Sequence, residues 1–532
     1  MKKLTARLWM LIALPLLLGL ASCTDTVDNP VTNPDEPQQQ LADYTIIWYG
    51  HGGGNLDLSL TDNMMQFYMA DADSYDNVKI AAQYKYSALE GMEDTFDDFA
   101  EALADYYEPG TADYDEAMQE LEAFKTMYYP MAGKTTRFVV DMEHFMEFVG
   151  DAEAPRPTGG WLLPGGNADI TRPDSLANFI DWAVRTCPAR KYILVLSDHG
   201  GGYLPNDELP AGADAARKTR GVVYDDGNDS RHFTAKTLAQ AISQASVRPS
   251  VVYLDACLMN TAEYQFELAP TTDYLVLSTF TVPGEGGNYP ALIDALSENP
   301  DDLETALTDF AKATVDGWDE TAEEDAEEEG EPVYHDINVY RTADIDALGA
   351  QIKTFTDRLV SAYQTGGDDV RAKIDEVTAN AYRVNEETPT YDLIDYAVNL
   401  TLALPDVFGS VWDSPLGQAF DRCIVYQQSS RWLQENDGTV DLSVLLGCQG
   451  HYTLDEGFMQ MRFDADGTAY PIFYTGLSEE DAEPWGSTLD ETYGQLRFDQ
   501  LTGWSRWLRL NQQEPNPESA TGYNPFDRRK RK

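Results

Sequence analysis

The chain has 532 residues, which is long enough for roughly two to four ordinary domains and at least one large hydrophobic core. Its 91 acidic residues outnumber its 37 basic residues and give a formal net charge of −54, so it repels phosphate backbones and nucleic acid is not an expected partner. A hydrophobic fraction of 43% excludes a disordered chain, and five cysteines are too few for a disulfide-stapled fold.

The N-terminus has the pattern of a bacterial export signal. Three basic residues among the first seven precede the apolar run 8–20, which is too short to cross a membrane as a helix. The following run 20–23, Leu-Ala-Ser-Cys, resembles a lipobox, in which the cysteine is lipidated after cleavage; a plain cleaved signal is the alternative. We therefore expect a lipoprotein signal peptide at 1–22, then lipidated Cys23 within a flexible tether, 23–42, and an anchor on either face of a bacterial outer membrane.

From residue 43 onward, strand and helix patterns alternate. Helical spacing of apolar residues recurs over 174–184 and 234–245, and the acidic, aromatic-rich segment 85–130 is predicted to be a helical insertion whose role the sequence does not indicate. Continuous apolar runs typical of strands buried on both faces lie at 44–49, 137–140, 192–196, 250–254 and 274–277. This order predicts an α/β/α sandwich with a mostly parallel central sheet.

An acidic stretch divides this first segment from the rest of the chain. We interpret the dense acidic residues from Asp316 to Pro332 as a disordered surface loop. The folded part then divides into a body at 43–330 and a C-terminal segment at 331–532. In the latter we predict a mixed α+β structure, with a strand at 336–340, helices to about residue 404 and strands after them.

Two reactive side chains directly follow predicted strands. His199 follows the run 192–196 and precedes three glycines, and Cys257 follows the run 250–254. Because the carboxyl ends of parallel strands meet at one edge of a sheet, we expect the imidazole and the thiol to lie side by side. A thiol nucleophile needs a nearby base and a donor for the developing oxyanion. On spacing alone, a purely structural Cys257 is the alternative.

The residues around both side chains resemble the motifs of the clostripain family of cysteine peptidases. The run 190–203 is similar to that family's histidine motif, and the run 253–259, Tyr-Leu-Asp-Ala-Cys-Leu-Met, is similar to its cysteine motif. The resemblance implies a caspase-like α/β/α fold and cleavage of peptide bonds after Arg or Lys. It also implies that His199 and Cys257 form the catalytic dyad and that the Gly200 N–H group is an oxyanion donor.

The resemblance further implies a specificity residue and a site of self-cleavage. Asp255 matches the acidic residue that lines the family's pocket for a basic side chain; a structural carboxylate that accepts loop N–H groups is the alternative. The chain departs from the family near this pocket, with Ser-Thr at 278–279 where paired acidic residues are usual. Members of the family are often cut between the two motifs, and here Arg217, Lys218 and Arg220 are the candidate cleavage sites.

The expected partners are polypeptide substrates, and the dyad requires no cofactor and no metal. The acidic turns 225–229 and 464–467 lack the bidentate glutamate of a full calcium loop, so we interpret them as turns and leave calcium binding open. The competing hypothesis is a non-catalytic surface lipoprotein that binds peptides or glycans through some of its 10 Trp and 30 Tyr residues.

Overall fold

A computed structural model describes much of the chain after the first 40 residues. The described residues are 41–140, 161–162, 167–203, 221–228, 231–329, 334–381, 390–409, 415–436, 447–449, 459–463, 469–473 and 493–511. Across these ranges, no helix is both long enough and apolar enough to cross a membrane.

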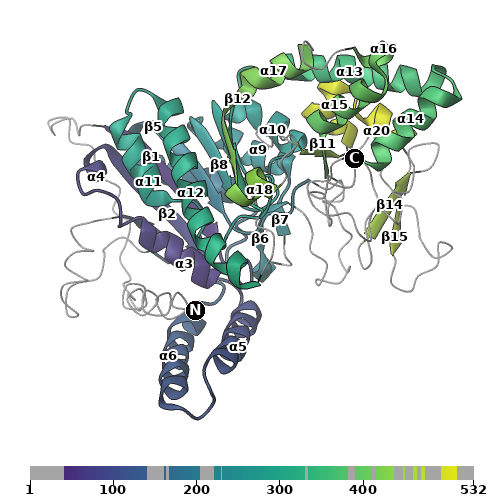
Figure 1. The fold of residues 1–532 in the computed structure, drawn as a ribbon. Coiled ribbons are helices and arrows are strands. Elements are labelled where there is room, and N and C mark those ends of the chain that lie inside the picture. Colours follow the sequence, from purple (N-terminus) through teal and green to yellow (C-terminus); the bar gives the residue numbers. More distant parts are fainter. Residues whose placement is uncertain are drawn as a thin grey trace.

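The centre of this part of the chain is a nine-stranded sheet with helices on both faces (Figure 1). Its strands are β1 (Ala42–His51), β2 (Val78–Lys85), β3 (Thr135–Val139), β4 (Trp161–Leu162), β5 (Ala189–Ser197), β8 (Val251–Asp255), β9 (Tyr274–Leu277), β10 (Asp336–Arg341) and β12 (Ile424–Ser429). They lie in the order β12-β10-β9-β8-β5-β1-β2-β3-β4. The central strands β9, β8, β5, β1 and β2 run parallel, and antiparallel pairs extend the sheet on both sides. The predicted α/β/α sandwich is confirmed.

Helices cover the two faces of the sheet and bury its side chains in two separate cores. One face carries α3 (Asp57–Gln66), α4 (Ser74–Asn77), α11 (Tyr289–Glu298) and α12 (Leu303–Glu329), and the other carries α8 (Pro173–Thr186), α9 (Ala235–Gln244) and α10 (Ala262–Leu268). In β1, Ile46 and Trp48 enter the first core while Ile47 and Tyr49 enter the second. Because alternate side chains point to opposite faces and both faces are covered, the central strands are apolar throughout.

The insertion at 85–130 is a pair of helices, which confirms the helical prediction. Helix α5 (Leu89–Tyr106) and helix α6 (Ala112–Tyr128) form a hairpin that extends away from the sandwich (Figure 1). Tyr128 anchors the base of this hairpin, because its ring packs edge-on against the ring of Tyr86 and its hydroxyl group shares a hydrogen bond of 2.8 Å with Thr61 in α3.

The prediction of a disordered loop from Asp316 to Pro332 is wrong as far as residue 329, where helix α12 ends. Alanine and glutamate both have high helix propensity, and Lys312 pairs with Asp316 one turn along the helix. Trp318 is buried, and its indole N–H donates to the carbonyl oxygen of Gly286 at 2.8 Å. The buried Trp318 side chain thus keeps α12 packed against the core where the acidic stretch begins.

The segment after residue 331 supplies two strands of the central sheet and a layer of helices. Its described helices are α13 (Ile345–Thr365), α14 (Asp368–Ala379), α15 (Leu393–Ala403), α16 (Pro405–Phe408), α17 (Pro415–Cys423), α18 (Arg431–Asn436), α19 (Arg497–Thr502) and α20 (Ser505–Leu510). Short strand pairs join β11 (Thr390–Asp392) to β13 (Gly447–Gln449) and β14 (Met459–Phe463) to β15 (Ala469–Phe473). The predicted strand at 336–340 and the helices up to residue 404 are confirmed. Strand β10 pairs directly with β9, so the sheet continues across residue 331.

Candidate active site

The structure brings His199, Gly200 and Cys257 together at the carboxyl ends of two neighbouring strands. Strands β5 and β8 pair in parallel with Ser197 opposite Asp255, so the chain leaves the sheet at adjacent points. Gly200 lies against the backbone of Cys257, and a Cβ atom at Gly200 would lie 2.2 Å from the Cys257 carbonyl oxygen. Only a residue without a side chain permits this approach.

Cys257 is a free, half-buried thiol. The backbone N–H group of Val282, in the loop after β9, donates to its Sγ atom at 3.3 Å. Burial raises the pKa of the Cys257 thiol above its ordinary value, although the Val282 hydrogen bond acts in the opposite direction. The thiol is therefore protonated at neutral pH and needs a base to become a nucleophile.

Backbone strain adjoins both reactive residues. Among the described residues, Val223 and Leu258 are the non-glycine positions with positive φ, at 60° and 64°. Leu258 directly follows Cys257, and the Val223 N–H group donates to the carbonyl oxygen of His199 at 3.3 Å. A β-branched residue rarely occupies the left-handed region, and such strain clusters at functional sites.

The imidazole of His199 contacts the side chain of Asn55, a residue that the sequence analysis did not single out. Its Nε2 atom lies 2.6 Å from Asn55 Oδ1. Asn55 comes from the turn after β1, which pairs with β5, so a polar residue at that strand end is the signal that would have pointed to it. The His199 backbone N–H donates to the carboxylate of Asp198, whose other oxygen accepts from the Tyr224 N–H at 2.8 Å. Burial raises the pKa of Asp198 to about 8, although the charge of His51 opposes this shift.

Asp255 is buried at the end of β8 and accepts four hydrogen bonds. Its Oδ1 atom accepts from the Tyr253 hydroxyl at 2.8 Å, and its Oδ2 atom accepts from the Tyr289 hydroxyl at 2.5 Å. Oδ2 also accepts from Ser197 Oγ and from the backbone N–H of Gly287, both at 3.3 Å. Burial raises the pKa of this carboxyl group, and these hydrogen bonds offset part of the shift. All four donors are uncharged, and no ion pair to Asp255 occurs within the described ranges.

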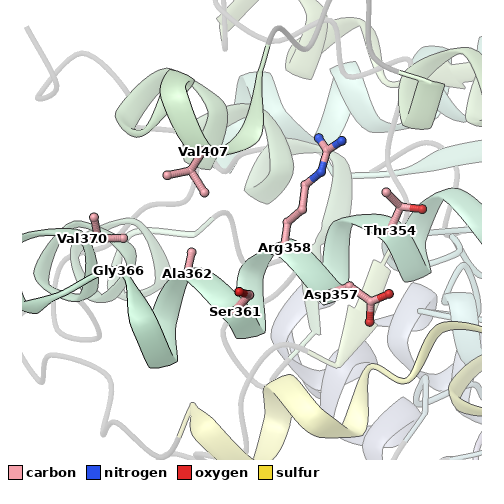
Figure 2. A pocket seen from close by; sticks show the side chains of 8 residues that line it. All are labelled: Thr354, Asp357, Arg358, Ser361, Ala362, Gly366, Val370 and Val407. Carbon is pink, nitrogen blue, oxygen red and sulfur yellow. The ribbon is translucent and has the colours of Figure 1, made fainter.

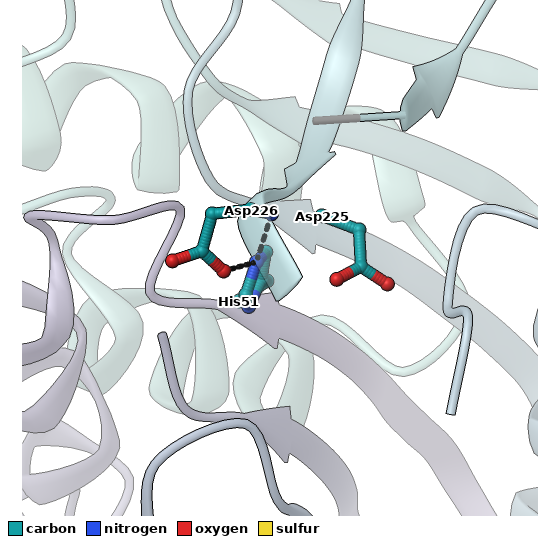
Figure 3. A group of neighbouring side chains, drawn as sticks. All are labelled: His51, Asp225 and Asp226. Atoms are coloured by element: carbon teal, nitrogen blue, oxygen red, sulfur yellow. Dashed lines mark hydrogen bonds and ion pairs between the residues drawn. The ribbon is translucent and has the colours of Figure 1, made fainter. Parts of the chain in front are cut away.

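A buried ionic cluster lies behind the glycine turn that follows β1. Figure 3 shows the His51 ring between the carboxylates of Asp226 and Asp225. Asp226 Oδ1 lies 3.1 Å from His51 Nε2, and the Lys85 ammonium group pairs with Asp225. A metal ion at this place would have to displace the Lys85 ammonium group, so the cluster fits internal ion pairing better than metal binding.

The charge of His51 contributes to stability in a defined pH range. Burial alone would lower the pKa of His51, but its hydrogen bond to Asp226 and the nearby charges of Asp198 and Asp225 raise it to about 9. A histidine whose pKa rises on folding binds its proton more tightly in the native state. This contribution is fully present below pH 6.5, the ordinary pKa of histidine, and is lost as the pH rises towards 9.

A cavity of about 490 Å³ lies elsewhere, between α13, α14 and α16 (Figure 2). Its lining residues are Thr354, Asp357, Arg358, Ser361, Ala362, Gly366, Val370 and Val407. None of the residues proposed for the dyad, the oxyanion site or the specificity pocket contributes to this cavity.

Several predicted sites lie outside the described residues. These are Cys23, the candidate cleavage positions Arg217, Lys218 and Arg220, and the turn 464–467. The other acidic turn begins with Asp225 and Asp226 of the buried cluster, and its residues Asp226–Asn228 form a short 3-10 turn, in agreement with its interpretation as a turn.

Comparisons with known proteins agree with the motifs at the two strand ends. A clostripain from Hathewaya histolytica is 31% identical over 150 residues, which is 26% of this chain and 27% of that protein. The alignment thus spans about a quarter of that relative.

Two solved structures are also similar to this chain. A secreted C11 cysteine protease from Bacteroides thetaiotaomicron with an irreversible peptide inhibitor gives 12% identity and a TM-score of 0.48, and the alignment covers 87% of this chain and 99% of that one. An inactive zymogen C11 protease from Parabacteroides distasonis gives 14% identity and a TM-score of 0.47, with the same coverage. The sequence profile of the clostripain family matches residues 165–409, a segment that contains His199 and Cys257. This segment of the chain therefore resembles the clostripain family of cysteine peptidases.

Proposed function

We propose that the protein is a cysteine endopeptidase with His199 and Cys257 as its catalytic pair. The observation that carries this proposal is their placement at the carboxyl ends of two paired parallel strands, within the segment that matches the family. The strained residues Val223 and Leu258 support the same location, because strain persists only where the surrounding structure holds it in place.

The chemistry follows from the protonation state of the thiol. His199 takes the proton from Cys257, and the thiolate attacks the carbonyl carbon of the scissile peptide bond. The Gly200 N–H group stabilises the oxyanion, and His199 then gives its proton to the departing amine, leaving a thioester on Cys257. A water molecule that loses a proton to His199 hydrolyses the thioester and restores the free thiol.

The proposed specificity is for Arg or Lys before the scissile bond, with Asp255 as the residue that pairs with the basic side chain. Two observations support this preference: the carboxylate is buried beside the Gly286–Gly287 turn, and its hydrogen-bond donors are all neutral. A buried carboxylate with only neutral partners is stabilised strongly by an incoming guanidinium group.

We further propose that the protein acts outside the cytoplasm as a lipid-anchored enzyme. The support is the N-terminal pattern of basic residues, a short apolar run and a lipobox ending at Cys23. Its substrates would then be polypeptides that reach the cell envelope.

Labelling with thiol-reactive peptide ketones tests the proposed function. We expect a probe ending in Arg to alkylate Cys257 at least about 100-fold faster than the same probe ending in Leu, because only the first pairs with a buried carboxylate. Peptide mapping by mass spectrometry identifies the labelled residue. Equal and slow labelling of all accessible thiols by both probes would instead indicate the non-catalytic binding protein.

Self-cleavage between the two motifs is a further expected result. A peptidase with Arg/Lys preference would cut its own chain after Arg217, Lys218 or Arg220, a stretch of small and charged residues. Gel mobility and N-terminal sequencing should show two fragments for the unmodified protein and one chain for Cys257→Ala. A fully active protein that stays intact would contradict this part of the proposal.

A further inference from the structure

We propose that Asn55 is a positioning residue for His199, and that the α5–α6 hairpin holds Asn55 in place. This inference rests on the proposed function and deepens it, because it adds a third residue to the dyad and gives the insertion at 85–130 a role. It is carried by a chain of contacts that runs from the imidazole to the first two turns of α5.

The first contact fixes the protonation pattern of the imidazole. Asn55 Oδ1 lies 2.6 Å from His199 Nε2, and an amide oxygen only accepts hydrogen bonds. His199 Nε2 therefore carries the proton, and the basic lone pair is on Nδ1. This is the nitrogen that would take the proton of Cys257. When the imidazolium ion forms, Asn55 still accepts from Nε2, so the ring keeps its orientation through the reaction.

The second set of contacts fixes the turn that carries Asn55. Its own N–H group donates to the Gly52 carbonyl oxygen at 3.1 Å, closing a tight turn directly after β1. Gly53 and Gly54 have φ angles of +57° and +100°, which residues with side chains rarely adopt. A Cβ atom on Gly53 would lie 2.9 Å from His199 Cδ2, so the turn packs directly against the edge of the ring that holds Nε2.

The third set of contacts comes from the start of the helical insertion. The Gly54 N–H group donates to Ser87 Oγ at 2.9 Å, and the Thr95 hydroxyl donates to the Gly54 carbonyl oxygen at 3.1 Å. A Cβ atom on Gly91 would lie 2.6 Å from that same carbonyl oxygen, so α5 packs backbone to backbone on the turn. The N–H group and the carbonyl oxygen of Gly54 are thus both hydrogen-bonded by side chains at the start of the hairpin.

An amide is a neutral partner in a site that already holds several charges. Within the described ranges, the titratable groups around His199 are Asp198 on its own loop, Cys257 across the site, and Asp226 and His51 behind the glycine turn. All four remain in the variants described below, so a difference between variants reports on Asn55 itself.

The test measures two quantities on the full chain: the rate of Cys257 alkylation by iodoacetamide across pH, and kcat and KM on an Arg-containing peptide. For Asn55→Ala, we expect alkylation at pH 7 and kcat to fall by about 10- to 100-fold, with KM changed less than about twofold. For Asn55→Asp, which keeps the acceptor, we expect recovery of at least about tenfold over Asn55→Ala. Its added charge should also shift the acidic limb of the pH profile upward, because a carboxylate stabilises the imidazolium ion.

The role of the hairpin is tested with a matched pair of threonine variants. Thr95 and Thr126 each donate to the carbonyl oxygen four residues earlier in their helices, at 2.8 and 2.9 Å, but Thr95 also reaches Gly54. Thr95→Val should therefore lower kcat, and Thr126→Val should leave it unchanged. Equal values for the two threonine variants would overturn the role of the hairpin.

Three results would overturn the positioning role of Asn55. These are an Asn55→Ala protein within twofold of the unmodified one, a rise in KM alone, or an Asn55→Asp protein no better than Asn55→Ala. None of them affects the proposed function, which fails separately if the unmodified protein neither cleaves peptides nor is labelled at Cys257 by the Arg probe.

Discussion

Replacing Cys257 with alanine is expected to lower peptide cleavage by more than about 10³-fold, because the thioester cannot form without the thiol. His199→Ala should cause a loss of similar size, and the double variant should be no worse than either single one. The two residues act as one unit, so their effects do not add. Initial rates on a fluorogenic peptide with Arg before the scissile bond measure all three variants.

Two other free thiols among the described residues provide the control for this experiment. Cys187 and Cys423 are buried, and burial raises the pKa of Cys187 to about 11 and that of Cys423 to about 12. Such thiols are unreactive, so Cys187→Ala and Cys423→Ala should retain activity once folded. Appreciable cleavage by the Cys257→Ala protein would show that another group is the nucleophile.

Replacing Asp255 with asparagine is expected to reduce the preference for Arg over Leu before the scissile bond by about 10²- to 10³-fold. The substitution is nearly isosteric and removes the negative charge that an incoming guanidinium group would meet in a buried place. The ratio of kcat/KM values for two peptides that differ only at that residue measures the effect.

Asp336 offers a matched control, because it is a second buried carboxylate that accepts hydrogen bonds from the loop after β9. Asp255 binds the same loop through the N–H group of Gly287. Asp336 accepts from the N–H groups of Thr279 and Phe280 at 2.6 and 3.1 Å. Asp336→Asn should lower the melting temperature and leave the Arg/Leu ratio unchanged. If Asp255→Asn behaves in the same way, or if the unmodified protein cleaves equally after Arg and Leu, Asp255 is a structural residue only.

The strands were predictable where the sequence itself records their burial. Runs such as 192–196 are apolar throughout because both faces of the sheet are covered, and each such run became a strand. Strand β2 was not predicted, because it contains Lys79, Gln83 and Lys85. Lys85 is buried because its ammonium group pairs with Asp225, 140 residues later, and donates to the carbonyl oxygen of Ala168. A partner so distant leaves no local pattern in the sequence.

The candidate site was predictable to the extent that its residues lie in continuous motifs. His199 and Cys257 each stand in a recognisable run at a strand end, whereas Asn55 stands in an ordinary glycine-rich turn, 144 residues before the histidine it contacts. That contact depends on β1 being the neighbour of β5, which is a property of strand order. In the same way, the hydroxyl group of Tyr289 in helix α11 donates to Asp255, and the residues next to Tyr289 in the sequence do not indicate this contact.

The order of strands in the sheet also has a consequence for how the chain folds as it is synthesised. Strand β9 is followed at its outer edge by β10 and then by β12, which ends at Ser429 in a chain of 532 residues. Until those strands emerge from the ribosome, β9 is the edge strand of the growing sheet, and the backbone N–H and C=O groups on its outer side are unpaired. This edge strand is the direct neighbour of β8, which leads to Cys257. An open edge of this kind pairs readily with other chains, so premature termination before β12 would leave an aggregation-prone product.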